Sequence, residues 1–220
     1  GDTPVVTTDT FKALFEKHIK DGNALTLLTA IVDNPKGYGR IKRNETGDQV
    51  EAIVEQADCD EVMDKVKEVN AGIYVFDNKE LFAHLHNLQA NNAQGELYLT
   101  DLLEMFRKEG LKVGASILDN PSEMMGVNNR WQLYEAGEAL KMRINKEHML
   151  NGVTIIDPKV TYIGPDVKIG PDTIIYPNTH IYGHTVIGNS NVIGPNTMII
   201  DCEICDNKEI ANTTIKNEKI

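Results

Sequence analysis

Hydrophobic positions recur every six residues in the last third of the chain. Isoleucine occupies seven consecutive positions of this repeat: Ile163, Ile169, Ile175, Ile181, Ile187, Ile193 and Ile199. A period of six fits neither the 3.6-residue repeat of an α-helix nor the two-residue alternation of a simple strand. It is typical of a solenoid with flat faces, in which each isoleucine stacks under the next to fill a narrow core. The pattern therefore predicts a parallel β-helix from Tyr162 to Ile199. Beyond Ile199 the isoleucines step by five and six, so we expect the coil to become irregular or to end there.

The first half of the chain has a different pattern, in which short apolar runs alternate with amphipathic stretches. It predicts strands at 24–32, 71–76 and 113–118, a β-hairpin from 39–43 and 49–55, and helices after Thr7 and around 79–88 and 99–110. Strands that alternate with helices favour an open, mainly parallel sheet.

A long helical pattern separates these two parts. It runs from Asn129 to Leu150, with apolar residues at helical spacing, and Asn151-Gly152 ends it. We therefore divide the chain into an α/β domain at 1–128, a connecting helix at 129–151 and the start of the hexapeptide coil at 152–220.

Composition excludes several classes of protein. The chain has 33 acidic and 22 basic residues, a net charge of -11 and no cluster of Lys and Arg, which argues against nucleic-acid binding. No apolar run approaches the length of a membrane span and no signal peptide is visible, so we expect a cytoplasmic protein without a membrane partner. The three cysteines, Cys59, Cys202 and Cys205, predict no disulfide framework. Cys202 and Cys205 have C-x-x-C spacing but no second pair for zinc, so we interpret them as ordinary thiols.

Six short motifs precede the coil. They are Gly1-Asp2-Thr3-Pro4, Gly37-Tyr38-Gly39-Arg40-Ile41, Ile53-Val54-Glu55, Asn70-Ala71-Gly72-Ile73-Tyr74, the run from Asn91 to Asp101 and Gly126-Val127-Asn128-Asn129-Arg130. In this order and spacing the set resembles the bacterial bifunctional N-acetylglucosamine-1-phosphate uridyltransferase / glucosamine-1-phosphate N-acetyltransferase family. The resemblance covers Gly1 to about Ile199. It implies part of a Rossmann-like nucleotidyltransferase domain followed by a left-handed parallel β-helix of hexapeptide repeats.

The resemblance also implies a reaction. UTP and N-acetylglucosamine-1-phosphate would form UDP-N-acetylglucosamine, a precursor of peptidoglycan, with release of pyrophosphate. In-line attack on the α-phosphorus needs positioning and charge neutralisation rather than a covalent nucleophile, so we identify no catalytic residue. Hard oxygen ligands suit Mg²⁺, and by resemblance Asp2 and Asn128 are its ligands. By the same resemblance Gly39 presents its backbone N–H to the sugar, Glu55 accepts hydrogen bonds from sugar hydroxyls, and Asn70 binds the sugar through its amide. Taken singly, Asp2 is a cap, Glu55 a solvated charge at the end of a strand and Asn70 a turn residue.

The sequence departs from the family's pattern at both ends. The family's glycine-rich phosphate loop and its uracil-binding residues come before Gly-Asp, and the acetyl-CoA site with its catalytic histidine lies on later coils. His180 and His184 do not match that histidine, and we expect no metal pairing between them. We therefore expect an incomplete version of the enzyme that neither forms UDP-N-acetylglucosamine nor transfers acetyl groups. Coils of this family pack three to a bundle, which implies a homotrimer.

Two alternatives stay open. One is another sugar-phosphate nucleotidyltransferase with a hexapeptide tail, such as a glucose-1-phosphate adenylyltransferase or a mannose-1-phosphate guanylyltransferase. The N-N-A-Q-G-E and G-V-N-N-R runs argue against it. The other is a non-catalytic module that trimerises or binds sugar. Finding whether residues precede Gly1 would distinguish these readings.

Overall fold

The computed structural model describes residues 3–89 and 97–220. The chain divides into two compact units, Gly1–Gly126 and Val127–Ile220, and each is described by itself.

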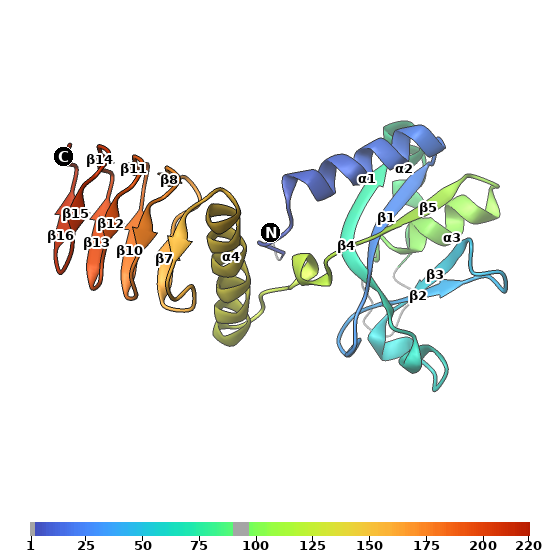
Figure 1. The fold of residues 1–220 in the computed structure, drawn as a ribbon. Coiled ribbons are helices and arrows are strands. Elements are labelled where there is room, and N and C mark those ends of the chain that lie inside the picture. Colours follow the sequence, from blue (N-terminus) through green and yellow to red (C-terminus); the bar gives the residue numbers. More distant parts are fainter. Residues whose placement is uncertain (1–2, 90–96) are drawn as a thin grey trace. The chain divides into compact units, whose positions relative to one another are not determined.

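The first unit is built on a five-stranded sheet with the order β3-β2-β4-β1-β5 (Figure 1). Its strands are β1 (Leu25–Ile31), β2 (Arg40–Arg43), β3 (Val50–Val54), β4 (Glu68–Phe76) and β5 (Val113–Ile117). Its helices are α1 (Thr8–Asp21), α2 (Asn78–His84) and α3 (Asp101–Lys108), and short 3₁₀ turns lie at Gln56–Asp58, Met63–Lys65, Leu85–Asn87 and Pro121–Met124.

The direction of the strands corrects one expectation. Of the pairings in this sheet only β1 with β5 is parallel, whereas β1 with β4, β2 with β3 and β2 with β4 are antiparallel. The prediction of a mainly parallel sheet is therefore wrong for the described part. The reason is the connection: the chain passes from β1 to β4 through the β2–β3 hairpin and two 3₁₀ turns, and parallel neighbours would need a crossover that this path does not supply.

Two apolar clusters fill the two faces of the sheet. Strand β1 is buried almost throughout and alternates between them. Leu25 and Leu27 pack with Phe106 and the other buried residues of α3, and Leu28 packs with Leu14 of α1 on the opposite face. The helices α1 and α3 thus cover opposite faces of the sheet (Figure 1).

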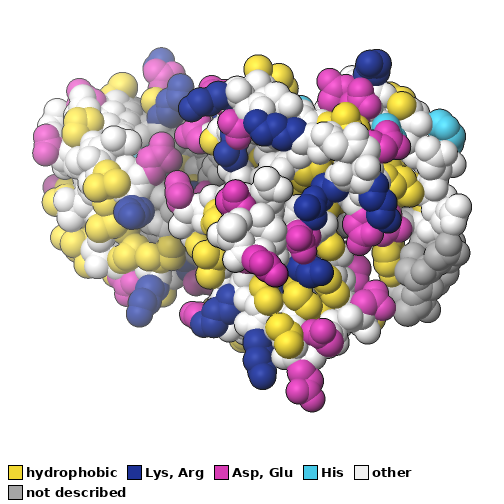
Figure 2. All heavy atoms as spheres, turned by 90° about the vertical axis from the view of Figure 1, so that its right-hand side faces the viewer, with side chains coloured by type: hydrophobic (Ala, Val, Ile, Leu, Met, Phe, Trp, Pro, Cys, Tyr) yellow, Lys and Arg dark blue, Asp and Glu magenta, His cyan; other side chains and the backbone are white. Residues whose placement is uncertain are grey.

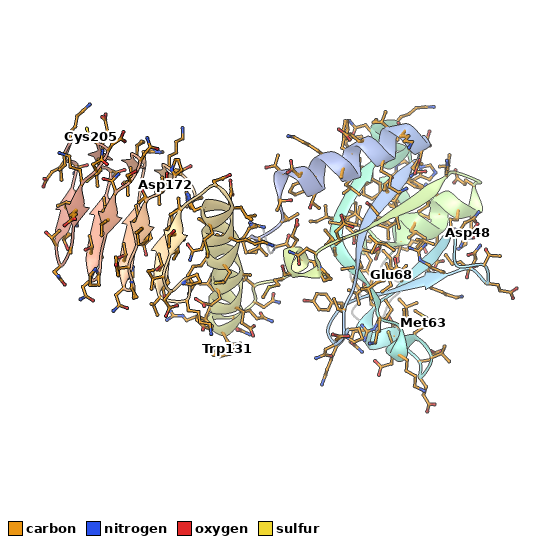
Figure 3. All side chains as sticks on the ribbon, viewed as in Figure 1. Asp48, Met63, Glu68, Trp131, Asp172 and Cys205 are labelled. Atoms are coloured by element: carbon orange, nitrogen blue, oxygen red, sulfur yellow. The ribbon has the colours of Figure 1, made fainter. Side chains whose placement is uncertain are left out.

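The second unit begins with α4 (Arg130–Leu150), which the side chain of Asn129 caps by accepting a hydrogen bond from the N–H of Gln132. Trp131 marks the start of this helix in Figure 3. The side chain of Asn145 donates to the carbonyls of Pro158 and Thr161, so the helix packs on the first coil within this unit. No helix among residues 3–89 and 97–220 is long and apolar enough to cross a membrane.

The coil confirms the prediction of a parallel β-helix. Its strands β6 to β16 form three parallel sheets of four, three and four strands: Thr154–Ile155, Thr161–Ile163, Lys168–Ile169, Ile174–Ile175, Thr179–Tyr182, Val186–Ile187, Val192–Ile193, Thr197–Ile200, Glu203–Ile204, Glu209–Ile210 and Thr214–Lys216. Ile163 pairs with Ile181, and Ile181 with Ile199, one full turn of eighteen residues apart. All three side chains are buried in one core.

Buried threonines stand at the corners of the coil. Thr179 and Thr185 are fully buried, and their hydroxyls donate to the carbonyls of Tyr176 and Tyr182 at 2.7 Å. A hydroxyl that bonds a nearby carbonyl satisfies both groups, so the corners carry polar residues without the cost of an unpaired buried group.

The coil also continues past Ile199. Ile187 pairs with Ile204, Ile193 with Ile210 and Ile199 with Ile215, separations of 17, 17 and 16 residues. The steps of five therefore shorten the corners while the strands stay in register. The sequence pattern suggested an irregular or ragged end, and the structure shows a regular core with shorter turns.

Candidate functional site

Gly39 and Glu55 face each other across the open end of the β2–β3 hairpin. Gly39 precedes β2 and Glu55 follows β3, and antiparallel pairing of Arg40 with Val54 places them side by side. A Cβ on Gly39 would lie 3.2 and 3.3 Å from the two carboxylate oxygens of Glu55 and 3.0 Å from Cγ2 of Ile53. The carboxylate therefore rests on the bare Cα of Gly39, and glycine is needed here for space rather than for an unusual backbone angle.

The surroundings of Glu55 favour its neutral form. Burial raises the pKa of this carboxyl group, and the charges of Asp58 and Asp101 raise it further. Among the described residues no donor offsets this effect. A half-buried carboxylate without a donor is an acceptor that a hydroxyl-rich ligand could satisfy.

Asn70 of β4 completes the group. Its backbone N–H donates to the carbonyl of Gly39 at 2.8 Å, which places it beside the glycine. Its side chain is held at both ends: Oδ1 accepts from the N–H of Gly72 at 3.0 Å, and Nδ2 donates to the hydroxyl of Tyr74 at 2.6 Å.

An irregularity in β4 brings Asn70 close to Tyr74. Leu27 of β1 pairs with Tyr74 and Thr29 with Asn70, so two steps along β1 match four steps along β4. Extra residues of this kind bend a strand and re-aim its side chains. Gly72 supports the bend with a φ of 72°.

Tyr74 belongs to the same site. Burial raises the pKa of its phenol, the hydrogen bond from Asn70 opposes that shift, and the charge of Glu55 adds to it. The charge of Glu55 therefore also raises the pKa of the Tyr74 phenol. Tyr74 ends the motif Asn70-Ala71-Gly72-Ile73-Tyr74, and no role was predicted for it from the sequence. The four-residue spacing around Gly72 was the signal that could have identified it.

The structure brings together three of the five residues predicted from the sequence: Gly39, Glu55 and Asn70. Asp2 lies outside the described residues, as does the run Asn91–Glu96. Asn128 lies in the second unit just before α4, where its side chain is exposed and its backbone N–H donates to Oε1 of Gln132 at 2.7 Å. Asp101 begins α3, as the pattern predicted.

A contact that the sequence did not predict fixes the start of α1. Oε2 of Glu123 accepts from the backbone N–H of Thr7 at 3.0 Å and from the hydroxyl of Thr10 at 2.5 Å. The turn Pro121–Met124 is thereby tied to the segment that follows Asp2 in the sequence.

Other candidate metal ligands do not gather. Within the described ranges no group of three or more His, Cys, Asp or Glu side chains could hold a metal ion. His180 stacks on Tyr162 with ring centroids 4.8 Å apart, and its Nδ1 lies 3.1 Å from the hydroxyl of Tyr182. Cys202 is buried and Cys205 exposed, both as free thiols.

A second polar group, formed by Arg43, Glu68 and Thr29, links three strands of the sheet. Arg43 donates to the two carboxylate oxygens of Glu68 at 2.6 and 2.7 Å, and the hydroxyl of Thr29 donates to the same carboxylate at 2.8 Å. Glu68 and Asp48 are labelled in Figure 3. Elsewhere on the surface, Figure 2 shows Lys and Arg side chains interspersed with Asp and Glu over the face turned to the viewer.

Comparisons with known proteins identify both units. Residues 3–122 match the family model described as nucleotidyl transferase, and residues 161–201 match the one described as bacterial transferase hexapeptide, six repeats. A bifunctional protein GlmU from Streptococcus thermophilus is 48% identical over 220 residues, all of this chain and 48% of that protein. GlmU proteins from Clostridium novyi and Lactococcus lactis are 52% and 51% identical, over 98% and 100% of this chain and 47% and 48% of theirs.

A solved structure from Bacillus anthracis, described as a glucose-1-phosphate thymidylyltransferase, matches with 21% identity and a TM-score of 0.43, over 59% of this chain and 48% of that one. Similarity at this level adds nothing to the assignment. The chain spans about half the length of the GlmU relatives, and its similarity to them extends over both units. Because the nucleotidyl transferase model covers more than half of the chain, the chain belongs to the nucleotidyl transferase family, with a hexapeptide coil after the transferase region and homology to the bifunctional GlmU proteins.

Proposed function

We propose that the first unit binds the sugar phosphate of a uridyltransferase reaction, in which UTP and N-acetylglucosamine-1-phosphate give UDP-N-acetylglucosamine and pyrophosphate. The observation that carries the proposal is the convergence of Gly39, Glu55 and Asn70, three residues remote in sequence, where the open end of the β2–β3 hairpin meets β4. Homology to GlmU proteins over the whole chain supports it.

Each of the three residues has a role that fits a sugar. The carboxylate of Glu55 lacks a donor among the described residues and can accept from sugar hydroxyls. Gly39 has no side chain between that carboxylate and the backbone, so a sugar ring can approach closely. Asn70 has one side-chain N–H left after its bond to Tyr74, and this N–H can donate to an oxygen of the N-acetyl group.

These contacts would orient the sugar phosphate. Holding the sugar phosphate in one pose aligns its phosphate oxygen with the α-phosphorus of UTP. The new P–O bond forms as the bond to pyrophosphate breaks, and no covalent intermediate with the protein is needed. The protein therefore contributes binding and alignment from this unit rather than a nucleophile.

The proposal includes Mg²⁺, held by Asp2 and Asn128. A carboxylate and an exposed amide oxygen are hard donors of the kind this ion prefers, with phosphate and water completing its shell. When bound, the ion would neutralise charge on the phosphate oxygens.

The second unit enters the proposal as an assembly module. Residues 161–201 match the hexapeptide model, and the family resemblance implies coils that pack three to a bundle. We therefore propose a homotrimer built on the coil, in a cytoplasmic enzyme of cell-wall precursor synthesis. The acetyl-CoA-dependent acetylation of glucosamine-1-phosphate that the family resemblance implies is not assigned to any residue of this chain. Sedimentation equilibrium at micromolar concentration should give a trimer, and a clean monomer would contradict the assembly.

Binding measurements test the site itself. Isothermal titration of the 220-residue chain with N-acetylglucosamine-1-phosphate should show binding that Glu55→Ala weakens about tenfold or more, since a charged acceptor is lost. Glu45→Ala, an exposed acid in the turn of the same hairpin, should leave it unchanged. Equal affinities for the two variants would place the sugar elsewhere.

A further inference from the structure

The sugar-binding role proposed for Asn70 depends on which way its amide faces. A backbone N–H can only donate, so the atom of Asn70 that faces the N–H of Gly72 at 3.0 Å must be the oxygen. The amide nitrogen must then face Tyr74, whose hydroxyl lies 2.6 Å away. The two contacts together fix the plane of the amide and leave one N–H for a ligand.

We infer that Tyr74 is a positioning residue that selects N-acetylated sugar phosphates by holding the amide of Asn70. The inference rests on the proposed function and deepens it. Its phenol oxygen accepts from Asn70, so the remaining N–H of the amide is aimed and does not rotate freely. A sugar without the acetamido group offers no carbonyl to this N–H and would gain nothing from the alignment.

The ring of Tyr74 is suited to this role because its place is fixed. It packs on the core cluster of Leu25, Leu27 and Phe106, and it lies 6.0 Å from the ring of Phe76. Its backbone is opposite Leu27 in the register of β1 and β4. The hydroxyl is therefore held by packing and stands at the edge of the core, where Asn70 reaches it.

The phenol also stays protonated. Burial raises its pKa, the bond from Asn70 lowers it, and the charge of Glu55 raises it, with a net shift upward. At neutral pH the group therefore keeps its hydrogen while its oxygen accepts from Asn70. A tyrosinate would accept more strongly but would place a second negative charge beside Glu55.

Tyr74→Phe tests the inference, because it removes the hydroxyl and keeps the ring. Tyr134→Phe is the matched control, since that tyrosine is exposed on α4 of the second unit. Titrations of the 220-residue chain would compare N-acetylglucosamine-1-phosphate with glucose-1-phosphate. We expect Tyr74→Phe to weaken binding of the acetylated ligand about fivefold and that of glucose-1-phosphate less than about twofold. An equal loss for both ligands, or no loss for either, would overturn the selective role.

A double-mutant cycle with Asn70 distinguishes a positioning role of Tyr74 from a direct contact between Tyr74 and the sugar. In an Asn70→Ala background, Tyr74→Phe should have no further effect on the affinity for N-acetylglucosamine-1-phosphate, because the group it orients is gone. Independent, additive losses would mean that Tyr74 acts without Asn70.

A ligand-free measurement keeps the inference testable if the proposed function fails. The two side-chain amide hydrogens of Asn70 should give distinct NMR signals, one of them protected from exchange, and Tyr74→Phe should remove that protection. If the chain binds neither sugar phosphate but this protection is lost, the proposed function fails while the positioning contact stands. If protection persists in the variant, the positioning role is wrong regardless of binding.

Discussion

The carboxylate of Glu123 accepts a hydrogen bond from the backbone N–H of Thr7 at 3.0 Å, across 116 residues of sequence. Thr7 is also the N-cap of α1, and the hydroxyl of Thr10 in the first turn donates to the same carboxylate oxygen. The first turn of a helix leaves donors without partners, and a negative charge there is favourable. Glu123 therefore fixes both the start of α1 and the segment that precedes it.

Glu123→Gln should lower the free energy of unfolding by about 1–2 kcal/mol, because it weakens two hydrogen bonds to a charged acceptor and removes the charge at the helix start. Urea unfolding of the first unit measures this change. Glu45→Gln, in the exposed turn of the β2–β3 hairpin, serves as the control and should unfold as the parent does. An unchanged midpoint in Glu123→Gln would show that water replaces the contact at no cost.

Gly39→Ala should impair sugar binding more than folding. The added Cβ would lie 3.2 and 3.3 Å from the carboxylate oxygens of Glu55, so the carboxylate has to move from the place where it meets the sugar. We expect the affinity for N-acetylglucosamine-1-phosphate to fall about tenfold or more. Gly137→Ala, in open space on α4, is the control for the extra methyl group and should bind normally. Normal binding by Gly39→Ala would remove Gly39 and the present position of Glu55 from the site.

The raised pKa of Glu55 predicts that its carboxylate lowers the stability of the fold, although the carboxylate is proposed to bind the sugar. Its pKa is raised in the folded state by burial first and by Asp58 and Asp101 next, so its ionisation opposes folding. The penalty is absent below the ordinary pKa of the unfolded chain and grows as the pH rises through the raised folded value. Glu55→Gln should therefore raise the melting temperature at pH 7 and leave it unchanged near pH 3, while it weakens sugar binding.

Glu68→Gln is the control for that experiment, because the pKa of Glu68 is shifted in the opposite direction from that of Glu55. Burial alone would raise the pKa of Glu68, but the hydrogen bonds from Arg43 and Thr29 and the charge of Arg43 leave it below its ordinary value. A depressed folded pKa gives stability above the unfolded pKa that is lost as the pH falls through the folded value. Glu68→Gln should therefore destabilise the protein at pH 7. If Glu55→Gln also destabilises it there, the charge of Glu55 is paired in the folded state and the argument for a free acceptor fails.

The sequence alone was enough to predict the coil. A six-residue period has no competing interpretation, so the stacked core from Ile163 to Ile199 followed directly from it. The regular pairing as far as Ile215 was not predicted, because a shortened corner breaks the sequence period without breaking the register of the strands. Strand direction in the sheet was also missed, since apolar runs report burial and not direction.

The candidate site also contains contacts that the sequence pattern could not predict. Gly39, Glu55 and Asn70 were proposed through the family resemblance that the motifs carry, and the β2–β3 hairpin brings the first two together. Tyr74 depends on the irregularity in β4 opposite Leu28, and Glu123 on a contact across 116 residues. Neither arrangement leaves a periodic trace in the sequence, because each arises from how the strands and turns pack.

The magnesium ligands give the last prediction, because they should respond to the ion differently from the sugar ligands. The test is uridyl transfer by a protein in which this chain follows the family's nucleotide-binding loop, measured over a range of Mg²⁺ concentrations. Asp2→Asn keeps the shape of the ligand and removes its charge, so it should lower kcat about tenfold or more and shift the magnesium midpoint upward. Asn128→Ala removes a neutral oxygen and should act more mildly, with partial rescue at high Mg²⁺. Asp9→Asn, an exposed acid near the start of α1, is the control for charge in this segment.

Glu55→Ala should differ in kind from both variants. It removes an acceptor for sugar hydroxyls, so it should raise the KM for N-acetylglucosamine-1-phosphate and leave the magnesium midpoint where it was. The contrast matters more than either result, because a general loss of structure would move both quantities in every variant. If Glu55→Ala shifts the magnesium midpoint while Asp2→Asn leaves it unchanged, then the half-buried carboxylate beside Gly39 binds the ion, and the roles proposed for the two acids have to be exchanged.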